Sequence, residues 1–183
     1  KHVAFSKTRQ EFEFIYKKAN QRLIKNINKL DTISNDKIIE YPIEAIKYLK
    51  KISKKIDIFD GTLLTFDYGY IEGKRHDTLQ SVKKHRYTDP LLNPGNADIT
   101  SHINFKLFSE ILSKSNLNVN KIATQSEFLK KMGIIERANM LSKKMTFKEK
   151  ANMFYRLKKL IDCREMGDLF KVLFAQKKDR KFS

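Results

Sequence analysis

Residues 60–70 read DGTLLTFDYGY, and this segment is the best guide to the architecture of the chain. Gly61 interrupts the preceding helical pattern, and the nearly continuous apolar run 62–66 predicts a buried strand covered on both faces, as in a parallel sheet. Ligands of open α/β sheets bind beyond the carboxyl ends of the strands. The four residues that follow the run are therefore candidates for lining a cleft: Asp67, Tyr68, Gly69 and Tyr70.

Working outward from this segment, the hydrophobic pattern predicts alternating strands and helices. Apolar residues at spacings of three and four upstream of Gly61 predict an amphipathic helix over 43–56, and period-two alternation predicts a hairpin over 3–16. Downstream, the pattern predicts strands at 78–82 and 119–123, helices at 105–112, 125–132, 134–144 and 147–161, and a last apolar segment at 169–175. This alternation indicates the α/β class.

The loop over 85–102 concentrates residues that can carry chemistry. It contains His85, Asp98 and His102 together with prolines and a glycine, and loops of this kind often carry function. The spacing matches no metal motif, so we expect no metal. A serine hydrolase is also disfavoured, because the chain has no Gly-x-Ser-x-Gly motif.

The composition fits a folded, positively charged chain. Its 183 residues are 40% apolar and 32% charged, with Lys+Arg 38 against Asp+Glu 21 and a net charge of +17. The 30 lysines outnumber the 8 arginines, so solvated helix faces explain the charge better than a nucleic-acid site, which would favour arginine. No apolar run reaches the roughly 20 residues of a membrane span. The single cysteine, Cys163, excludes an internal disulfide, and we expect it to be a packing residue.

The glycines do not form a nucleotide cradle. No two of the six are spaced as Gly-x-Gly, and no Gly-x-x-x-x-Gly-Lys motif occurs. If the domain binds a nucleotide cofactor, we expect its main cofactor loop upstream of Lys1.

Several motifs in order resemble one family. Residues 60–70 end in the Asp-Tyr-Gly-Tyr of that family's glycine-containing strand. The other matching motifs are Thr78-Leu79-Gln80 through His85, Asp89-Pro90-Leu91, Pro94-Gly95, the run from Asp98 to Phe105, Thr124-Gln125, Phe128-Leu129, Gly133-Ile134, Arg137, and the run from Met166 to Leu173. The set resembles the MidA-type S-adenosylmethionine-dependent methyltransferases, which include a mitochondrial protein arginine methyltransferase that assists complex I assembly.

The resemblance implies a class I, Rossmann-like methyltransferase fold with a mixed sheet and flanking helices, of which this chain is the C-terminal part. It covers about 61–173 clearly and the first 58 residues loosely. We therefore expect three parts: residues 1–58 as a hairpin and helix, 59–176 as the C-terminal part of the catalytic domain, and 177–183 as a basic tail. The implied cofactor is S-adenosyl-L-methionine in the full-length protein, and the fragment alone is expected to be inactive.

Residue chemistry suggests roles within an arginine methyltransferase. Asp67 and Asp98 could pair with the substrate guanidinium, which binds carboxylates bidentately. His85 or His102 could accept the proton that is lost. The remaining predicted substrate-binding residues are Tyr68, Gly69, Tyr70 and Gln125, the tyrosines by stacking on a cation.

The expected partner is a protein substrate, a complex I subunit, with no nucleic acid and no membrane insertion. The expected location is the bacterial cytoplasm, or the mitochondrial matrix in a eukaryote. Two alternatives remain open: a non-catalytic assembly or scaffold remnant, and a basic nucleic-acid-binding module. Because half of a central sheet would expose a strand edge, we expect the isolated chain to pair with another chain or to aggregate.

Overall fold

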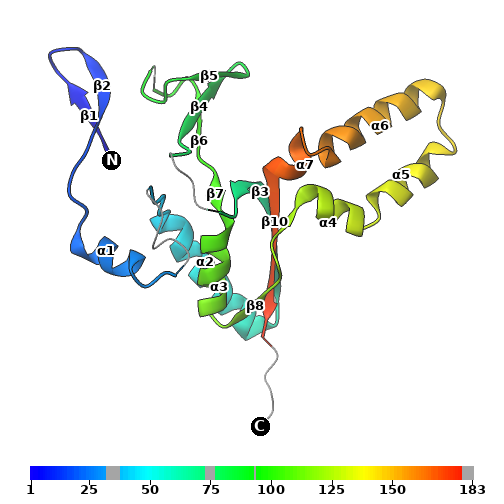
Figure 1. Cartoon of the computed structure of the whole chain (residues 1–183), viewed down its shortest axis with the longest axis horizontal. Helices are drawn as coiled ribbons and strands as arrows, with labels where there is room; N and C mark the ends of the chain where they lie inside the picture. The colour runs from blue at the N-terminus through cyan, green and yellow to red at the C-terminus, as the bar shows by residue number, and fades with distance from the viewer. Residues whose placement is uncertain (32–37, 73–76, 93, 179–183) are drawn as a thin grey trace, which may run out of the picture. The chain divides into compact units, whose positions relative to one another are not determined.

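The computed structural model describes residues 1–31, 38–72, 77–92 and 94–178, and it divides into two compact units (Figure 1). The first unit consists of Lys1–Tyr41 and Gly73–His102, and the second of Pro42–Glu72 and Ile103–Ser183. The three-part division expected from the sequence stays a prediction.

The first unit contains two small antiparallel sheets. Strands β1 (His2–Ser6) and β2 (Glu11–Ile15) form the expected hairpin, in which the rings of Phe5 and Phe12 meet edge to face. Helix α1 (Gln21–Ile27) follows, and the Asn20 side chain accepts a hydrogen bond from the Leu23 amide at its start. In the second sheet, strand β4 (Gln80–Lys83) lies between β5 (Arg86–Thr88) and β6 (Asp98–Thr100).

A mixed sheet forms the centre of the second unit. Its strand order is β7 (Ile103–Asn104), β3 (Thr62–Tyr70), β10 (Phe170–Lys177) and β8 (Leu117–Val119), and β9 (Ala123–Thr124) also pairs with β10. The pairing of β3 with β7 is parallel, and β10 is antiparallel to β3, β8 and β9. The expected α/β class and mixed sheet are confirmed.

Strand β3 differs from the expectation in three ways. It runs antiparallel to its main partner, β10, and it is not covered on both faces, because Leu64 is 48% and Phe66 37% exposed. It also continues to Tyr70, so Asp67 lies inside the strand and not beyond its end. A short apolar run cannot distinguish a doubly covered parallel strand from an antiparallel one with a partly open face.

The single strand expected over 119–123 is wrong in a related way. The structure has two short strands there, β8 and β9, which pair with different parts of β10. Between them the backbone N–H of Asn120 donates to the Phe174 carbonyl at 3.0 Å. One long strand therefore serves as the template for two short ones.

Helices on both sides complete the second unit. Helix α2 (Ile43–Phe59) buries one stripe of its surface, and α3 (Phe105–Lys114) begins where the Asn104 side chain accepts from the Leu107 amide at 3.0 Å. The fully buried large side chains of this unit belong to α3 and β10: Phe105, Leu107, Leu112 and Leu173.

The remaining helices form an arm that leads away from the sheet in Figure 1. They are α4 (Gln125–Lys131), α5 (Ile134–Ser142), α6 (Phe147–Ile161) and the single turn α7 (Met166–Leu169), which returns the chain to β10. Gly133 lies between α4 and α5 with φ 80°, a left-handed conformation that suits glycine. Among the residues described, no helix combines the length and hydrophobicity needed to cross a membrane.

Candidate functional site

The C-terminal end of β3 carries the first group of predicted site residues. The Asp67 carboxylate accepts a hydrogen bond from the backbone N–H of Tyr68 at 2.8 Å, which holds one of its two oxygens. The Tyr68 ring meets Phe170 edge to face, with 5.6 Å between ring centroids. Tyr70 is buried. The local fold thus leaves Asp67 half-buried, with a second carboxylate oxygen available for other contacts.

Gly69 has a steric role at the crossing of β3 and β7. A Cβ at this position would lie 2.3 Å from the Ile103 carbonyl oxygen and 2.7 Å from the Phe105 ring. These distances are shorter than any normal contact, so only glycine allows β7 and the start of α3 to approach so closely. The expected substrate-binding role of Gly69 stays a prediction.

The strand register places three polar side chains in one row across the sheet. Asp67 on β3 is paired with Lys171 on β10, and Lys171 is paired in turn with Thr124 on β9. Residues directly opposite one another in antiparallel strands project from the same face. The row therefore combines a carboxylate, an ammonium group and a hydroxyl at the edge where α4 and α7 meet the sheet.

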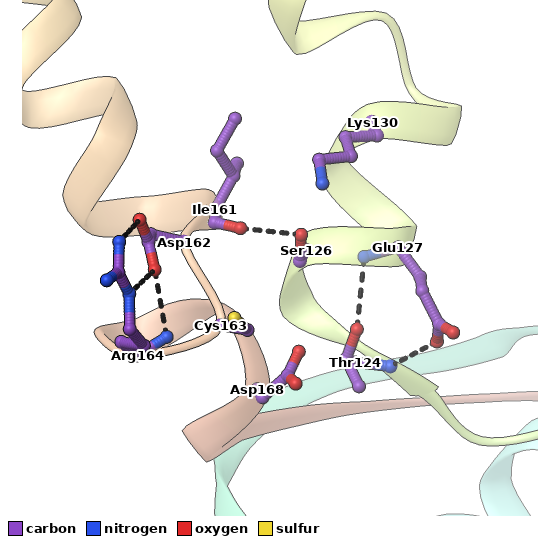
Figure 2. A pocket seen from close by; sticks show the side chains of 9 residues that line it. All are labelled: Thr124, Ser126, Glu127, Lys130, Ile161, Asp162, Cys163, Arg164 and Asp168. Atoms are coloured by element: carbon purple, nitrogen blue, oxygen red, sulfur yellow. Dashed lines mark hydrogen bonds and ion pairs between the residues drawn. The ribbon is translucent and has the colours of Figure 1, made fainter.

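An open hollow of about 630 Å³ lies next to this row (Figure 2). It is formed by the start of α4, the end of α6 and the turn into α7. Its lining residues are Thr124, Ser126, Glu127, Lys130, Ile161, Asp162, Cys163, Arg164 and Asp168. Thr124 belongs both to the hollow and to the polar row. The row therefore runs from Asp67 on β3, across β10, to the hollow at Thr124 on β9.

Side chains of α4 fix the walls of the hollow by binding the end of α6. The Gln125 amide nitrogen donates to the Leu160 carbonyl at 2.9 Å, and the Ser126 hydroxyl donates to the Ile161 carbonyl at 2.7 Å. Both side chains are buried. Gln125, predicted from sequence to bind substrate, thus forms a hydrogen bond to the end of α6 in this structure. Its substrate role stays a prediction.

Hydrogen bonds also order the turn that closes the hollow. The Asp162 carboxylate accepts from the backbone N–H of Arg164 at 2.9 Å and pairs with its guanidinium at 3.4 Å. These bonds lower the pKa of Asp162 and raise that of Arg164. Close packing of Gly167 completes the turn, since its Cβ would lie 2.7 Å from the Asp162 carbonyl oxygen.

Three ionisable or nucleophilic side chains remain directed at the open space. Figure 2 shows Lys130, Cys163 and Asp168 around the hollow, apart from the Asp162–Arg164 pair. Cys163 is exposed, so its expected role as a packing residue is wrong. It follows the last residue of the apolar face of α6 by two positions and lies in the turn after the helix. The hollow can therefore contact a ligand through a cation, a carboxylate and a thiol.

The other predicted site residues belong to the first unit. His85 and Lys84 form the two-residue tip of the β4–β5 hairpin, both with positive φ, and His85 is exposed. Asp98 is the exposed first residue of β6. The backbone N–H of His102 donates to the Thr78 hydroxyl at 2.8 Å. These residues belong to the first unit, whereas Asp67 belongs to the second.

Several residues of the hollow escaped the sequence analysis. The Thr-x-x-Glu spacing at 124–127 could have marked the start of α4, since it is the signature of a capping box. Lys130 carried no comparable signal, and Asp168 lay in the Met166–Leu173 motif without being singled out. Within the described ranges, no group of three His, Cys, Asp or Glu side chains is arranged to hold a metal ion.

Comparison with known proteins defines the class of protein. The sequence model of the family described as "Putative S-adenosyl-L-methionine-dependent methyltransferase" matches residues 2–123. This chain belongs to that family. Among curated relatives, it is 30% identical over 153 residues to "Protein arginine methyltransferase NDUFAF7, mitochondrial" of Xenopus tropicalis, covering 83% of this chain and 35% of that protein. It is 29% identical over 136 residues to the Drosophila melanogaster homolog of the same name, covering 74% of this chain and 31% of that protein.

Solved structures show the same fold. A chain from Burkholderia thailandensis that was bound to S-adenosyl-homocysteine superposes with a TM-score of 0.75 at 24% identity, covering 96% of this chain and 46% of that one. A native crystal structure of an uncharacterized protein from the same organism gives 0.76 at 22% identity, covering 96% and 48%. This chain thus spans about a third of the length of its curated relatives and about half of these solved chains.

Proposed function

We propose that this chain forms the part of an S-adenosylmethionine-dependent protein arginine methyltransferase that binds the methyl acceptor, here called the acceptor side. The family match over residues 2–123 carries the proposal, because it contains the whole Asp67–Tyr70 segment and the 85–102 loop. The names of the relatives support arginine as the methylated residue. The resemblance to MidA-type enzymes further supports a complex I subunit as the substrate protein.

The described residues do not by themselves fit a complete cofactor cradle. Gly69 and Gly167 are packed against the chain's own backbone, and Gly133 is the N-cap of α5. With no Gly-x-Gly spacing in the sequence, we assign the acceptor side and not the cofactor loop to this chain. Isothermal calorimetry with the chain alone should accordingly detect no binding of S-adenosylmethionine, and tight binding would contradict this assignment.

The protein must do two things to the arginine side chain that accepts the methyl group. An arginine guanidinium is protonated in water, so one nitrogen must be oriented toward the methyl donor and must lose a proton on transfer. The free oxygen of Asp67, with Asp98, suits the orienting role, because a carboxylate accepts the guanidinium N–H groups in pairs. His85 or His102 suits the proton-accepting role, since imidazole is the side chain that most often acts as a general base.

Asp67→Asn in a full-length protein that carries this chain tests the proposal. The asparagine oxygen can still accept the Tyr68 N–H, so the local fold should persist while the charge is lost. We expect transfer of labelled methyl groups to protein arginine to fall at least about 100-fold, within the range of catalytic contacts. Asp57→Asn, on α2 of the same unit, should keep full activity. Full activity of both Asp67→Asn and Asp98→Asn would overturn the assignment.

A further inference from the structure

The turn between α5 and α6 exposes large apolar side chains. We call Met140–Lys148 the hairpin tip. Within it, Phe147 is 89% exposed, Met140 70% and Leu141 47%. Figure 1 shows this turn at the far end of the arm from β10. Single exposed apolar residues are ordinary on a protein surface, but three on one turn mark an interaction site.

The same turn is strongly basic. Lys143, Lys144 and Lys148 are exposed within the tip, and the segment contains no acidic residue. The nearest acid, Glu149, has its carboxylate bound to the Thr146 amide and hydroxyl, both at 2.8 Å. The tip therefore presents apolar side chains surrounded by positive charge.

Local hydrogen bonds hold the tip in this arrangement. The Ser142 hydroxyl donates to the Asn139 carbonyl at 2.8 Å, and the Met145 amide donates to the Ser142 carbonyl at 3.1 Å. The capping box of Thr146 and Glu149 then starts α6 directly after the turn. Because both helix ends are fixed, Phe147 and the lysines are presented without a prior ordering step.

We propose that the hairpin tip docks on the surface of an anionic lipid bilayer, with Phe147, Met140 and Leu141 entering the headgroup region. Basic segments with Phe and Leu on one side adsorb in this way, and lysines near an anionic surface add to the binding. A second copy of the chain is a poor occupant, because two tips would place lysine against lysine. The tip is also a protrusion, whereas the hollow of the candidate site lies at the opposite end of α6.

Sedimentation of the full chain with vesicles tests the proposal. Binding should be clear with phosphatidylcholine vesicles that contain phosphatidylserine, weak with pure phosphatidylcholine, and reduced by added salt. The triple variant Lys143→Glu, Lys144→Glu and Lys148→Glu should lose binding at least about 100-fold, since each of the three lysines contributes roughly a fivefold factor. The matched control changes three lysines of α2, with the same change in total charge: Lys50→Glu, Lys51→Glu and Lys54→Glu. Equal losses in the two variants would show attraction by net charge alone and would overturn the proposal.

A fluorescence experiment tests the apolar part separately. The chain contains no tryptophan, so Phe147→Trp introduces a single reporter at the tip. Its emission should shift to shorter wavelength when anionic vesicles are added, because the indole leaves water. Phe59→Trp, at another exposed phenylalanine of the same unit, should show no shift. Circular dichroism of each variant establishes that it is folded.

Two further results would overturn the proposal. One is an unshifted Phe147→Trp emission with vesicles that the folded variant nevertheless binds. The other is retention on immobilised polyglutamate that the tip variant loses, without vesicle binding by the original chain. That second result would assign the tip to an acidic protein partner.

Discussion

Position 69 shows how one residue controls the meeting of two segments. The strand β3 and the start of α3 are far apart in sequence, yet they approach so closely at Gly69 that no other side chain fits. The same approach brings β7 into parallel pairing with the end of β3. The geometry of the Asp67–Tyr70 segment therefore depends on the absence of a single methyl group.

Gly69→Ala should destabilise the second unit by about 1–3 kcal/mol, the usual cost of overpacking a closely packed site. The backbone carbonyl of Ile103 is the nearest obstacle, and it cannot move without disturbing the pairing of β7 with β3. Unfolding in urea, followed by circular dichroism, measures the change. Gly61→Ala is the matched control, because its Cβ would meet only ordinary contacts at 3.8 Å. Equal stability of the two variants would contradict this account.

At the scale of single elements, two of the arm's helices, α4 and α6, begin at reciprocal caps. In α4, Thr124 accepts from the Glu127 amide while the Glu127 carboxylate accepts from the Thr124 amide, and Thr146 and Glu149 repeat the arrangement in α6. The sequence pattern [Ser/Thr]-x-x-Glu identifies both starts. The capping box of α4 lies at the candidate site, and the capping box of α6 lies at the end of the hairpin tip.

The α6 cap should make the stability of the arm depend on pH. Bonds from the Thr146 amide and hydroxyl lower the pKa of Glu149 below its ordinary value of 4.5. A carboxyl with a lowered folded-state pKa stabilises the fold above its unfolded pKa, and this contribution is lost as pH falls through the folded value. Thermal melts between pH 6 and pH 3 should therefore show a steeper acid loss in the original chain than in Glu149→Gln.

Two further variants separate this cap from general effects. Thr146→Ala removes the hydroxyl and should cost about 1 kcal/mol, as is usual for an N-cap threonine. Glu136→Gln removes a carboxylate from the first turn of α5, where the structure shows no capping bond. It should keep the pH profile of the original chain. A profile for Glu149→Gln that matches the original would show that the bonds to Thr146 are not the cause.

The sequence predicts helices more accurately than strands in this chain. Periodicity located α2, α4 and α6 within a few residues, because this signal is local. Strand partners are not local. Nothing near Leu64 indicates that its partner is Phe174, on a strand more than a hundred residues later, so the sequence did not reveal that the main pairing of β3 is antiparallel.

For the whole molecule, the sequence likewise predicts some parts of the candidate site and misses others. The motif at 67–70 was visible in sequence, as were the histidines and Asp98 of the loop. The hollow was not, because it forms only when α4, α6 and α7 meet through bonds such as Ser126 to the Ile161 carbonyl. Cys163 was misjudged for the same reason. Its exposure depends on the turn after α6, and the apolar pattern of the helix does not report that turn.

The edge of β3 that faces away from β10 determines whether the isolated chain should associate with itself. Among the described residues, β7 pairs only with Gly69 and Tyr70, so on that side Thr62–Tyr68 has no strand partner. An open edge with exposed Leu64 and Phe66 is a template for another strand.

Light scattering after size-exclusion chromatography should therefore show the chain as dimers or larger species at micromolar concentration. Leu64→Lys places a charge on the exposed face of the open strand and should shift the chain toward monomer, because natural edges use lysine to block pairing. Leu92→Lys, at an exposed leucine of the first unit, should leave the size distribution unchanged. A stable monomer of the original chain would mean that the β3 edge is protected by something other than a paired strand.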